Sequence, residues 1–341
     1  MRMRYANLVV GLLAALLLTP ATRAQSPHDP FAFFADDLTL GTADRAALGR
    51  GDVIVHSLSS KGNEIAVLVA IATTATPTQL VTHARNIYQF KSGELVHAVG
   101  RISTPATAQD FDALPVSESD LADMRACRPG NCGLKLTAGE IASMRAAMTP
   151  GSSTPPGPTT LRRLLAERVQ RYQRGGLGDL PSAADGHDEV PPATAFVALL
   201  NGHAYLPASM PGLAGFLLGG GTAPPSVADH YLYWSYENTG QKLVASVTDL
   251  TIARADTPDL PSVMILGKQV LATHYFTGSL NLLSLAGPAN GPRYLVMINR
   301  SRVDVLSGPF RGFIRGTIER RVRAAVSGVM TELKRRVEAT R

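Results

Sequence analysis

The residues best suited to acid–base chemistry lie together in the apolar segment His274-Tyr275-Phe276. A histidine can gain or lose a proton near neutral pH, so His274 could serve as a general base. The segment alternates as a strand does, which puts His274 and Tyr275 on opposite faces and lets only one of them face a cavity. A hydrogen-bonded histidine of the core or surface is the preferred alternative, and no catalytic residue is assigned.

Aromatic side chains gather in the predicted strand His230–Tyr236. Alternation puts Tyr231 and Tyr233 on one face and Trp234 on the other. Rings with a polar tip suit a pocket for an amphipathic ligand, so these three residues are candidates for ligand binding. Ordinary packing within a sheet explains them equally well and is the more common arrangement.

Two arginines follow the last predicted strand. Arg300 and Arg302 could clamp an anionic head group, because a guanidinium donates two parallel hydrogen bonds to such a group. The favoured alternative is an ion pair between Arg302 and Asp304.

Several catalytic patterns are absent from the sequence. There is no Gly-x-Ser-x-Gly nucleophile elbow and no His-Glu-x-x-His pair. The histidines lack the spacing of metal ligands, and no Lys-Ser or Lys-Thr follows Gly219-Gly220-Gly221 as a phosphate loop requires. The sequence therefore predicts neither a metal site nor a cofactor.

The two cysteines lie close together in Cys127-Arg-Pro-Gly-Asn-Cys132. In a cytosolic enzyme such a pair could be redox-active, but in an exported protein a structural disulfide is expected. Pro129-Gly130 supplies the turn that brings the sulfurs together. Zinc would need two further ligands, and no histidine or cysteine nearby provides them.

The first 24 residues have the pattern of a cleavable secretory signal peptide. A positive start, Met1-Arg2-Met3-Arg4, precedes the apolar run Asn7–Leu18, and Thr22-Arg23-Ala24 places small residues before a cleavage site. The alternative is a membrane anchor, for which the run is too short. We therefore expect a periplasmic or secreted mature chain, 25–341, that is soluble or peripheral to a membrane.

The formal net charge of +6 is unevenly distributed along the chain. Three arginines fall in the predicted leader, and Pro309–Arg341 contains nine basic and three acidic residues. The basic character of the mature chain therefore belongs to one terminal segment. This distribution and the expected export both argue against a nucleic-acid partner.

Hydropathy patterns place most strands in two blocks. The first block has strands at Asp52–Leu58, Glu64–Thr74 and Leu95–Ile102, with a helix from Thr78 to Lys91 before the third strand. A mostly helical insertion follows at about 104–227. The second block has strands at 230–236, 242–254, 262–276, 280–286 and 294–299, and a long amphipathic helix begins near Pro309.

This order of elements resembles the START-like helix-grip superfamily, over about 53–102 and 229–341. The segments Ala272–Phe276 and Tyr294–Asp304 are also similar to those of an uncharacterised group of bacterial exported proteins. The resemblance implies an α+β fold in which a curved antiparallel sheet grips a long C-terminal helix around an apolar cavity, with the helical insertion added. Most helix-grip proteins bind apolar ligands, and some catalyse cyclisation or hydration, so the fold alone does not choose a function.

Three hypotheses follow, in order of preference. The first is an exported binding or carrier protein for an apolar or amphipathic, lipid-like molecule, with the insertion as a lid. The second is an enzyme on the same scaffold, which requires His274 or Tyr275 to converge with Arg302 in one cleft. The third is a cell-envelope interaction protein that docks through the basic C-terminal helix, with peripheral membrane contact as one form of docking. The candidate ligand-binding residues are Tyr231, Tyr233, Trp234, His274, Tyr275 and Arg302.

Overall fold

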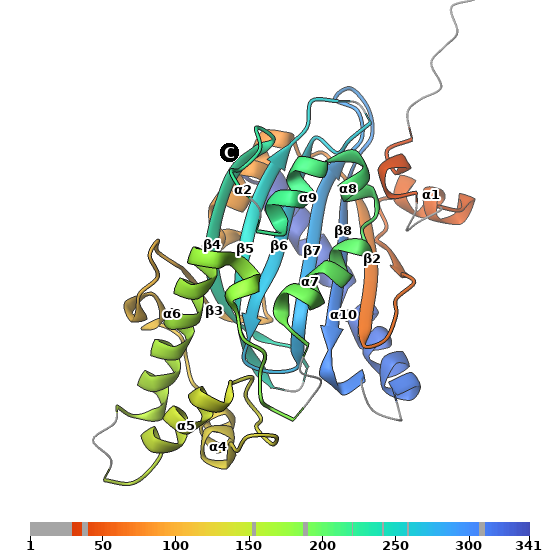
Figure 1. Cartoon of the computed structure of the whole chain (residues 1–341). Helices are drawn as coiled ribbons and strands as arrows, with labels where there is room; N and C mark the ends of the chain where they lie inside the picture. Colours follow the sequence, from red (N-terminus) through yellow and green to blue (C-terminus); the bar gives the residue numbers. More distant parts are fainter. Residues whose placement is uncertain are drawn as a thin grey trace, which may run out of the picture.

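A computed structural model describes residues 29–35, 40–151, 155–186, 190–219, 221–240, 242–257, 259–306 and 311–341. The predicted leader, residues 1–24, lies outside the described residues. The fold is α+β, as expected: one curved, unclosed antiparallel sheet with a long C-terminal helix and several further helices (Figure 1).

The sheet has eight strands in the order β1-β2-β8-β7-β6-β5-β4-β3, and all neighbouring strands are antiparallel. Strands β4 to β8 are joined by hairpins, so consecutive strands lie side by side. Strand β2 pairs with β8, which places β1 and β2 at the other end of the strand order. The strands are β1 (Ile54–Ser57), β2 (Glu64–Thr73), β3 (Val96–Arg101), β4 (Val227–Asn238), β5 (Leu243–Arg254), β6 (Val263–Ala272), β7 (Phe276–Ala286) and β8 (Arg293–Val303).

Several strand boundaries differ from the sequence prediction: Arg300 and Arg302, which were expected to follow the last strand, lie within β8, and the turn before β7 was missed. The predicted strand 262–276 ends at Ala272, and β7 begins at Phe276, so His274 and Tyr275 lie in the turn between the two strands. Tyr275 has a φ of 60°, in the left-handed region that non-glycine residues seldom adopt, and this conformation reverses the chain. The run Leu271–Phe276 contains no Gly, Pro, Asn or Asp to mark a turn, which is why the pattern alone predicted one strand.

One face of the sheet is covered by α2 (Pro77–Arg85), α3 (Ile87–Phe90) and α10 (Arg311–Glu338). Thr76 begins α2 with a capping box, because its hydroxyl accepts from the Gln79 N–H and the Gln79 side chain accepts from the Thr76 N–H. Leu80 and Ala84 then pack on the sheet together with Met330 and Leu333 of α10. We call this side the α10 face.

The opposite face carries the helical segment between β3 and β4 (Figure 1). In Figure 1, α7, α8 and α9 lie in front of the sheet, and α4, α5 and α6 lie at its lower end. We call this side the insertion face. The helices are α4 (Glu118–Ala126), α5 (Ala138–Ala147), α6 (Gly157–Gly175), α7 (Pro192–Asn201), α8 (Tyr205–Ser209) and α9 (Pro211–Leu217); α1 (Thr42–Gly49) flanks β2.

Hydrogen bonds fix both ends of α10 beside β2. Near its start, the Arg315 guanidinium donates to the carbonyls of Gly62 and Glu64 at the β1–β2 turn. Near its end, the Glu338 carboxylate accepts from the Thr73 hydroxyl at 2.9 Å and from the Thr74 N–H at 2.8 Å. The helix therefore runs alongside β2, the strand next to the edge strand β1.

The predicted disulfide is present, joining Cys127 and Cys132 in the loop after α4. No helix within the described ranges combines the length and apolar character needed to cross a membrane.

Gly100 in β3 offers a test of the packing around the only tryptophan. A Cβ at this position would lie 2.5 Å from the indole of Trp234, which is fully buried. Gly100→Ala should lower the free energy of unfolding by about 1–3 kcal/mol, because the ring cannot move away in a packed core. Gly328→Ala is the matched control: no atom lies within 4 Å of its Cβ position in α10, so stability should stay equal or rise. Urea unfolding measures both, and equal stabilities of wild type and Gly100→Ala would refute the assigned packing.

Candidate functional site

His274 is buried against the insertion, with its side chain 1% exposed. Its Nδ1 lies 2.6 Å from the Gly133 carbonyl and its Nε2 lies 2.9 Å from Asp120 Oδ1. Both partners are oxygen acceptors, so each ring nitrogen faces a group of the protein itself. The ring nitrogens of His274 are therefore occupied by the protein's own groups, and the ring ties α4 to the β6–β7 turn.

The Asp120 carboxylate is the centre of this network. It also accepts from the Tyr236 hydroxyl at 2.8 Å and caps α4 through Ser117. Burial acts to raise the pKa of Asp120, but the hydrogen bonds from His274, Ser117 and Tyr236 outweigh it and lower the pKa to about 2. The charged carboxylate is thus stabilised by folding.

The three aromatic candidates serve packing on two different faces. On the α10 face, the Tyr231 hydroxyl donates to the Ala84 carbonyl at 2.5 Å, and Tyr233 is buried next to it. Burial raises the pKa of both tyrosines. On the insertion face, Trp234 Nε1 donates to the Asp110 carbonyl at 2.6 Å. The three rings do not line one pocket.

The ring centroids of Tyr275 and His274 lie 5.8 Å apart. Tyr275 is half-buried and packs against the apolar cluster of the α10 face, and burial raises the pKa of its hydroxyl. Arg302 is half-buried at the end of β8, opposite Gly278. Asp304 forms an ion pair with Lys135 at 2.7 Å. Within the described residues no hydrogen bond or ion pair joins Arg302 to His274 or Tyr275, so only His274 and Tyr275 are brought together.

A second buried network joins the insertion to the centre of the sheet. Lys268 Nζ, on β6, donates to the Leu217 carbonyl at 2.8 Å and lies 3.3 Å from Asp249 Oδ2. Asp249 also accepts from the Tyr172 hydroxyl, and His230 Nε2 lies 2.5 Å from its other oxygen. Burial lowers the pKa of Lys268, whereas hydrogen bonds and nearby positive charge overcome burial and lower the pKa of Asp249. Tyr172 of α6 and Leu217 of α9 contribute to the network, and His230 lies at its exposed end.

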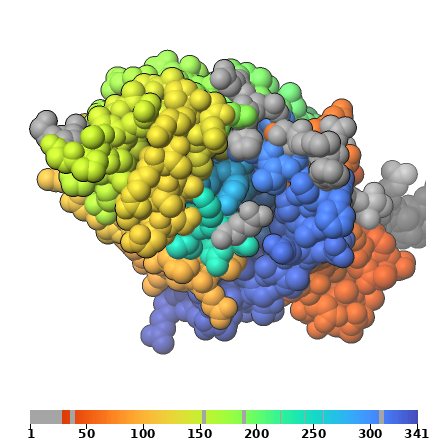
Figure 2. Space-filling view, turned by 90° about the horizontal axis from the view of Figure 1, so that it is seen from below, coloured from red at the N-terminus to blue at the C-terminus, as the bar shows by residue number. Residues whose placement is uncertain are grey.

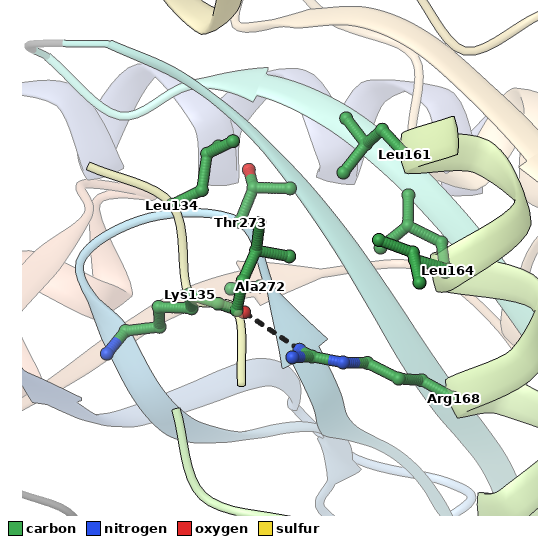
Figure 3. A pocket seen from close by; sticks show the side chains of 9 residues that line it. Leu134, Lys135, Leu161, Leu164, Arg168, Ala272 and Thr273 are labelled. Carbon is green, nitrogen blue, oxygen red and sulfur yellow. Dashed lines mark hydrogen bonds between the residues drawn. The ribbon is translucent and has the colours of Figure 1, made fainter. Parts of the chain in front are cut away.

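Two small cavities lie in the seam between the insertion and β6, with volumes of about 10 and 50 Å³. Lys135 and Arg168 line both (Figure 3), but Arg168 donates to the Lys135 carbonyl at 2.9 Å and pairs with Glu140. Figure 2 shows the surface hollowed at this end, between the insertion and the C-terminal part of the chain. The volumes hold a few waters at most and do not fit a lipid-like molecule.

The α10 face carries a row of uncharged polar side chains across four strands. We call it the polar row: Ser246, Gln269, Ser279, Asn281, Asn299 and Ser301. Asn281 and Asn299 are cross-strand partners and hydrogen-bond to each other, as do Ser279 and Ser301 at 2.8 Å. Gln269 donates to the Ser246 hydroxyl at 3.2 Å.

The polar row is partly accessible although it lies in the middle of the sheet. Asn281 is exposed, and Asn299, Gln269 and Ser246 are half-exposed, whereas Ser279 and Ser301 are buried. The helices α2 and α3 cover the other end of this face, and α10 lies along β2. Ile314, Ile318, Val322 and Val326 form an apolar stripe of α10 that packs only partly on the sheet; we call it the inner stripe. A polar, open part of the sheet therefore faces the same side as a half-buried apolar stripe.

Sequence reasoning missed the polar row, although a signal was present. Ser279 and Asn281 occupy alternate positions in β7, and Asn299 and Ser301 do so in β8. This alternation marks one face of two neighbouring strands as polar. The pattern does not show that the face stays open, because that depends on where α10 packs.

Among the described residues there is no group of three or more His, Cys, Asp or Glu side chains that could hold a metal ion. The comparisons with known proteins returned no match: no family model, no curated protein and no solved structure is similar to this chain.

The Asp120 network predicts an acid-dependent loss of stability. Because folding lowers the pKa of Asp120, its contribution is present above about pH 4 and is lost as the pH falls towards 2. Wild type should lose roughly 1–2 kcal/mol of unfolding free energy from this group over that range. Asp120→Asn should be less stable at pH 6 and should lack this component of the acid loss.

Urea unfolding at pH 2 to 6 measures the effect, and exposed Asp112 supplies the control variant Asp112→Asn. A wild-type acid profile in Asp120→Asn would contradict the assigned network.

Proposed function

We propose that the protein binds an amphipathic small molecule on the α10 face, between the polar row and the inner stripe of α10, and acts as an exported carrier. The observation that carries this proposal is the accessible polar row in the middle of a sheet, next to an incompletely packed apolar helix stripe. Apolar surface left half-exposed is unfavourable in water and favours a ligand that covers it.

The chemistry of the polar row indicates the kind of head group. Its amides and hydroxyls donate and accept hydrogen bonds but carry no charge. The Oε1 atom of Gln269 is buried and has no hydrogen-bond partner among the described residues. The charged groups on the neighbouring part of this face, Lys91 and Glu237, neutralise each other at 2.6 Å. The ligand is therefore one with an uncharged hydroxyl or amide head and an apolar body.

The element order supports the helix-grip likeness. From β2 onward it runs strand, two helices, six antiparallel strands and a terminal helix, with β2 paired to the last strand. In a helix-grip protein the space between the terminal helix and the sheet holds the ligand, which is where the polar row lies here. Export to the periplasm or the medium, proposed from the leader pattern, would suit a carrier of poorly soluble molecules.

An acid–base enzyme is not proposed. That alternative needs a proton-transferring group that faces substrate, and both ring nitrogens of His274 are bonded within the protein.

The first test identifies any molecule that co-purifies with the protein. The protein is purified from its exported fraction, extracted with organic solvent and examined by mass spectrometry. The expected result is an uncharged amphipathic molecule in near-stoichiometric amount. Failure to extract any ligand, together with no binding of uncharged or charged naphthylamine fluorophores, would refute the proposal.

A matched pair of α10 variants locates the site. Val322 is on the half-buried inner stripe and Ala324 is exposed. Val322→Trp should fill the space beside the polar row and weaken binding of the uncharged fluorophore N-phenylnaphthylamine by about tenfold or more, a loss of about 1.4 kcal/mol. Ala324→Trp should leave the affinity unchanged. Equal affinities in fluorescence titrations of the two variants would place the ligand elsewhere.

A further inference from the structure

The outer side of α10 carries an exposed aromatic ring above a group of arginines. Phe313 is 79% exposed, the most exposed of the large apolar side chains among the described residues. At 100° per residue, Arg320 and Ala324 lie on the same line of the helix as Phe313, and Arg321 and Arg323 flank that line. All three arginines are exposed. The inner stripe lies on the other side of the same helix.

The charge on this outer side is not neutralised within the described part of the chain. No ion pair joins Arg320, Arg321 or Arg323 to a carboxylate there, and Arg320 bonds only a helix carbonyl, that of Gly316. Glu332 pairs with Arg335 and Arg336 in the last part of the helix, two turns away from the arginine group. Three positive charges and one ring therefore face solvent together.

We infer that this outer side docks on an anionic phospholipid bilayer. Positive charge alone would suit any acidic partner, but a solvent-exposed phenylalanine in line with the arginines is favourable only where an apolar phase lies beyond the charged layer. Head groups of anionic lipids meet the guanidiniums, and the ring enters the interface between head groups and acyl chains. Docking in this way holds α10 parallel to the membrane plane, with its inner stripe turned to the polar row.

The orientation links docking to the proposed carrier function, although it rests on separate residues. One helix diameter, about 10 Å, separates the bilayer from the inner stripe. A lipid-like molecule that leaves the bilayer beside α10 reaches the apolar stripe without crossing bulk water.

The test measures co-sedimentation of the exported protein with two kinds of vesicle. One contains phosphatidylcholine alone, and the other also contains about 30 mol % phosphatidylglycerol, which makes its surface strongly anionic. Binding is expected only to the anionic vesicles and should weaken at high salt. The triple variant Arg320→Gln/Arg321→Gln/Arg323→Gln should bind about 100-fold more weakly, since each basic residue near the surface contributes about a factor of five.

The matched control changes the same charge elsewhere: Arg145→Gln/Arg171→Gln/Arg174→Gln, three exposed residues of α5 and α6. It should bind as wild type does. Phe313→Ser should weaken vesicle binding by about tenfold, and Phe313→Leu should restore it, since leucine supplies comparable apolar area.

Three outcomes would overturn the inference. The first is an equal loss of vesicle binding in the two triple variants. The second is binding that does not depend on Phe313 and also occurs with soluble polyglutamate or DNA. The third is the absence of wild-type binding to anionic vesicles. Loss of fluorophore binding in the triple variant would instead indicate damage to the helix, so the fluorophore titration separates failure of docking from failure of the proposed ligand site. Circular dichroism melts confirm that each variant is folded.

Discussion

The position of the helical insertion depends on buried charged groups of the sheet that bond to it. Lys268 is 3% exposed in the middle of β6, where an unpaired ammonium would cost several kcal/mol. Its partners come from both sides of the interface: Asp249 from the neighbouring strand and the Leu217 carbonyl from the end of α9. Moving α9 by one residue would leave the lysine with one partner fewer, so this contact fixes the insertion relative to the sheet.

The two faces of the sheet consequently differ in physical character. The insertion face contains buried charged groups that are bonded to one another, among them Asp120 with His274 and Arg300 with Glu64. The α10 face has uncharged amides and hydroxyls, which can exchange partners with solvent or a ligand at little cost. A face held by buried charges cannot open without large loss of stability, whereas a face lined by neutral polar groups can remain accessible. This difference is why the proposed ligand site lies under α10 and not under the insertion.

Much of the fold was predictable because strands and the terminal helix have strong local periodicity. Alternation located each strand of the second block, and the apolar stripe located α10. The turn at His274-Tyr275 was not predictable, since the positive φ of Tyr275 is imposed by contacts with distant residues, such as the Asp304 N–H that bonds its carbonyl. The partners of His274 were also beyond sequence reasoning, because Asp120 lies 154 residues away. The polar row was visible as a pattern, but its accessibility depends on the path of α10 along β2.

The path of α10 also bears on how one helix could serve the two proposed roles. Its ends are held by Arg315 at the β1–β2 turn and by Glu338 beside Thr73, so the middle of the helix needs little packing to stay in place. Apolar residues on the inner side can therefore remain half-buried. Arginines on the outer side do not need ion pairs to hold the helix in place. A helix fixed only by full burial could not leave an apolar stripe available on one side while presenting three unpaired arginines on the other. The anchoring at both ends is thus the feature that permits ligand contact and surface contact on the same element.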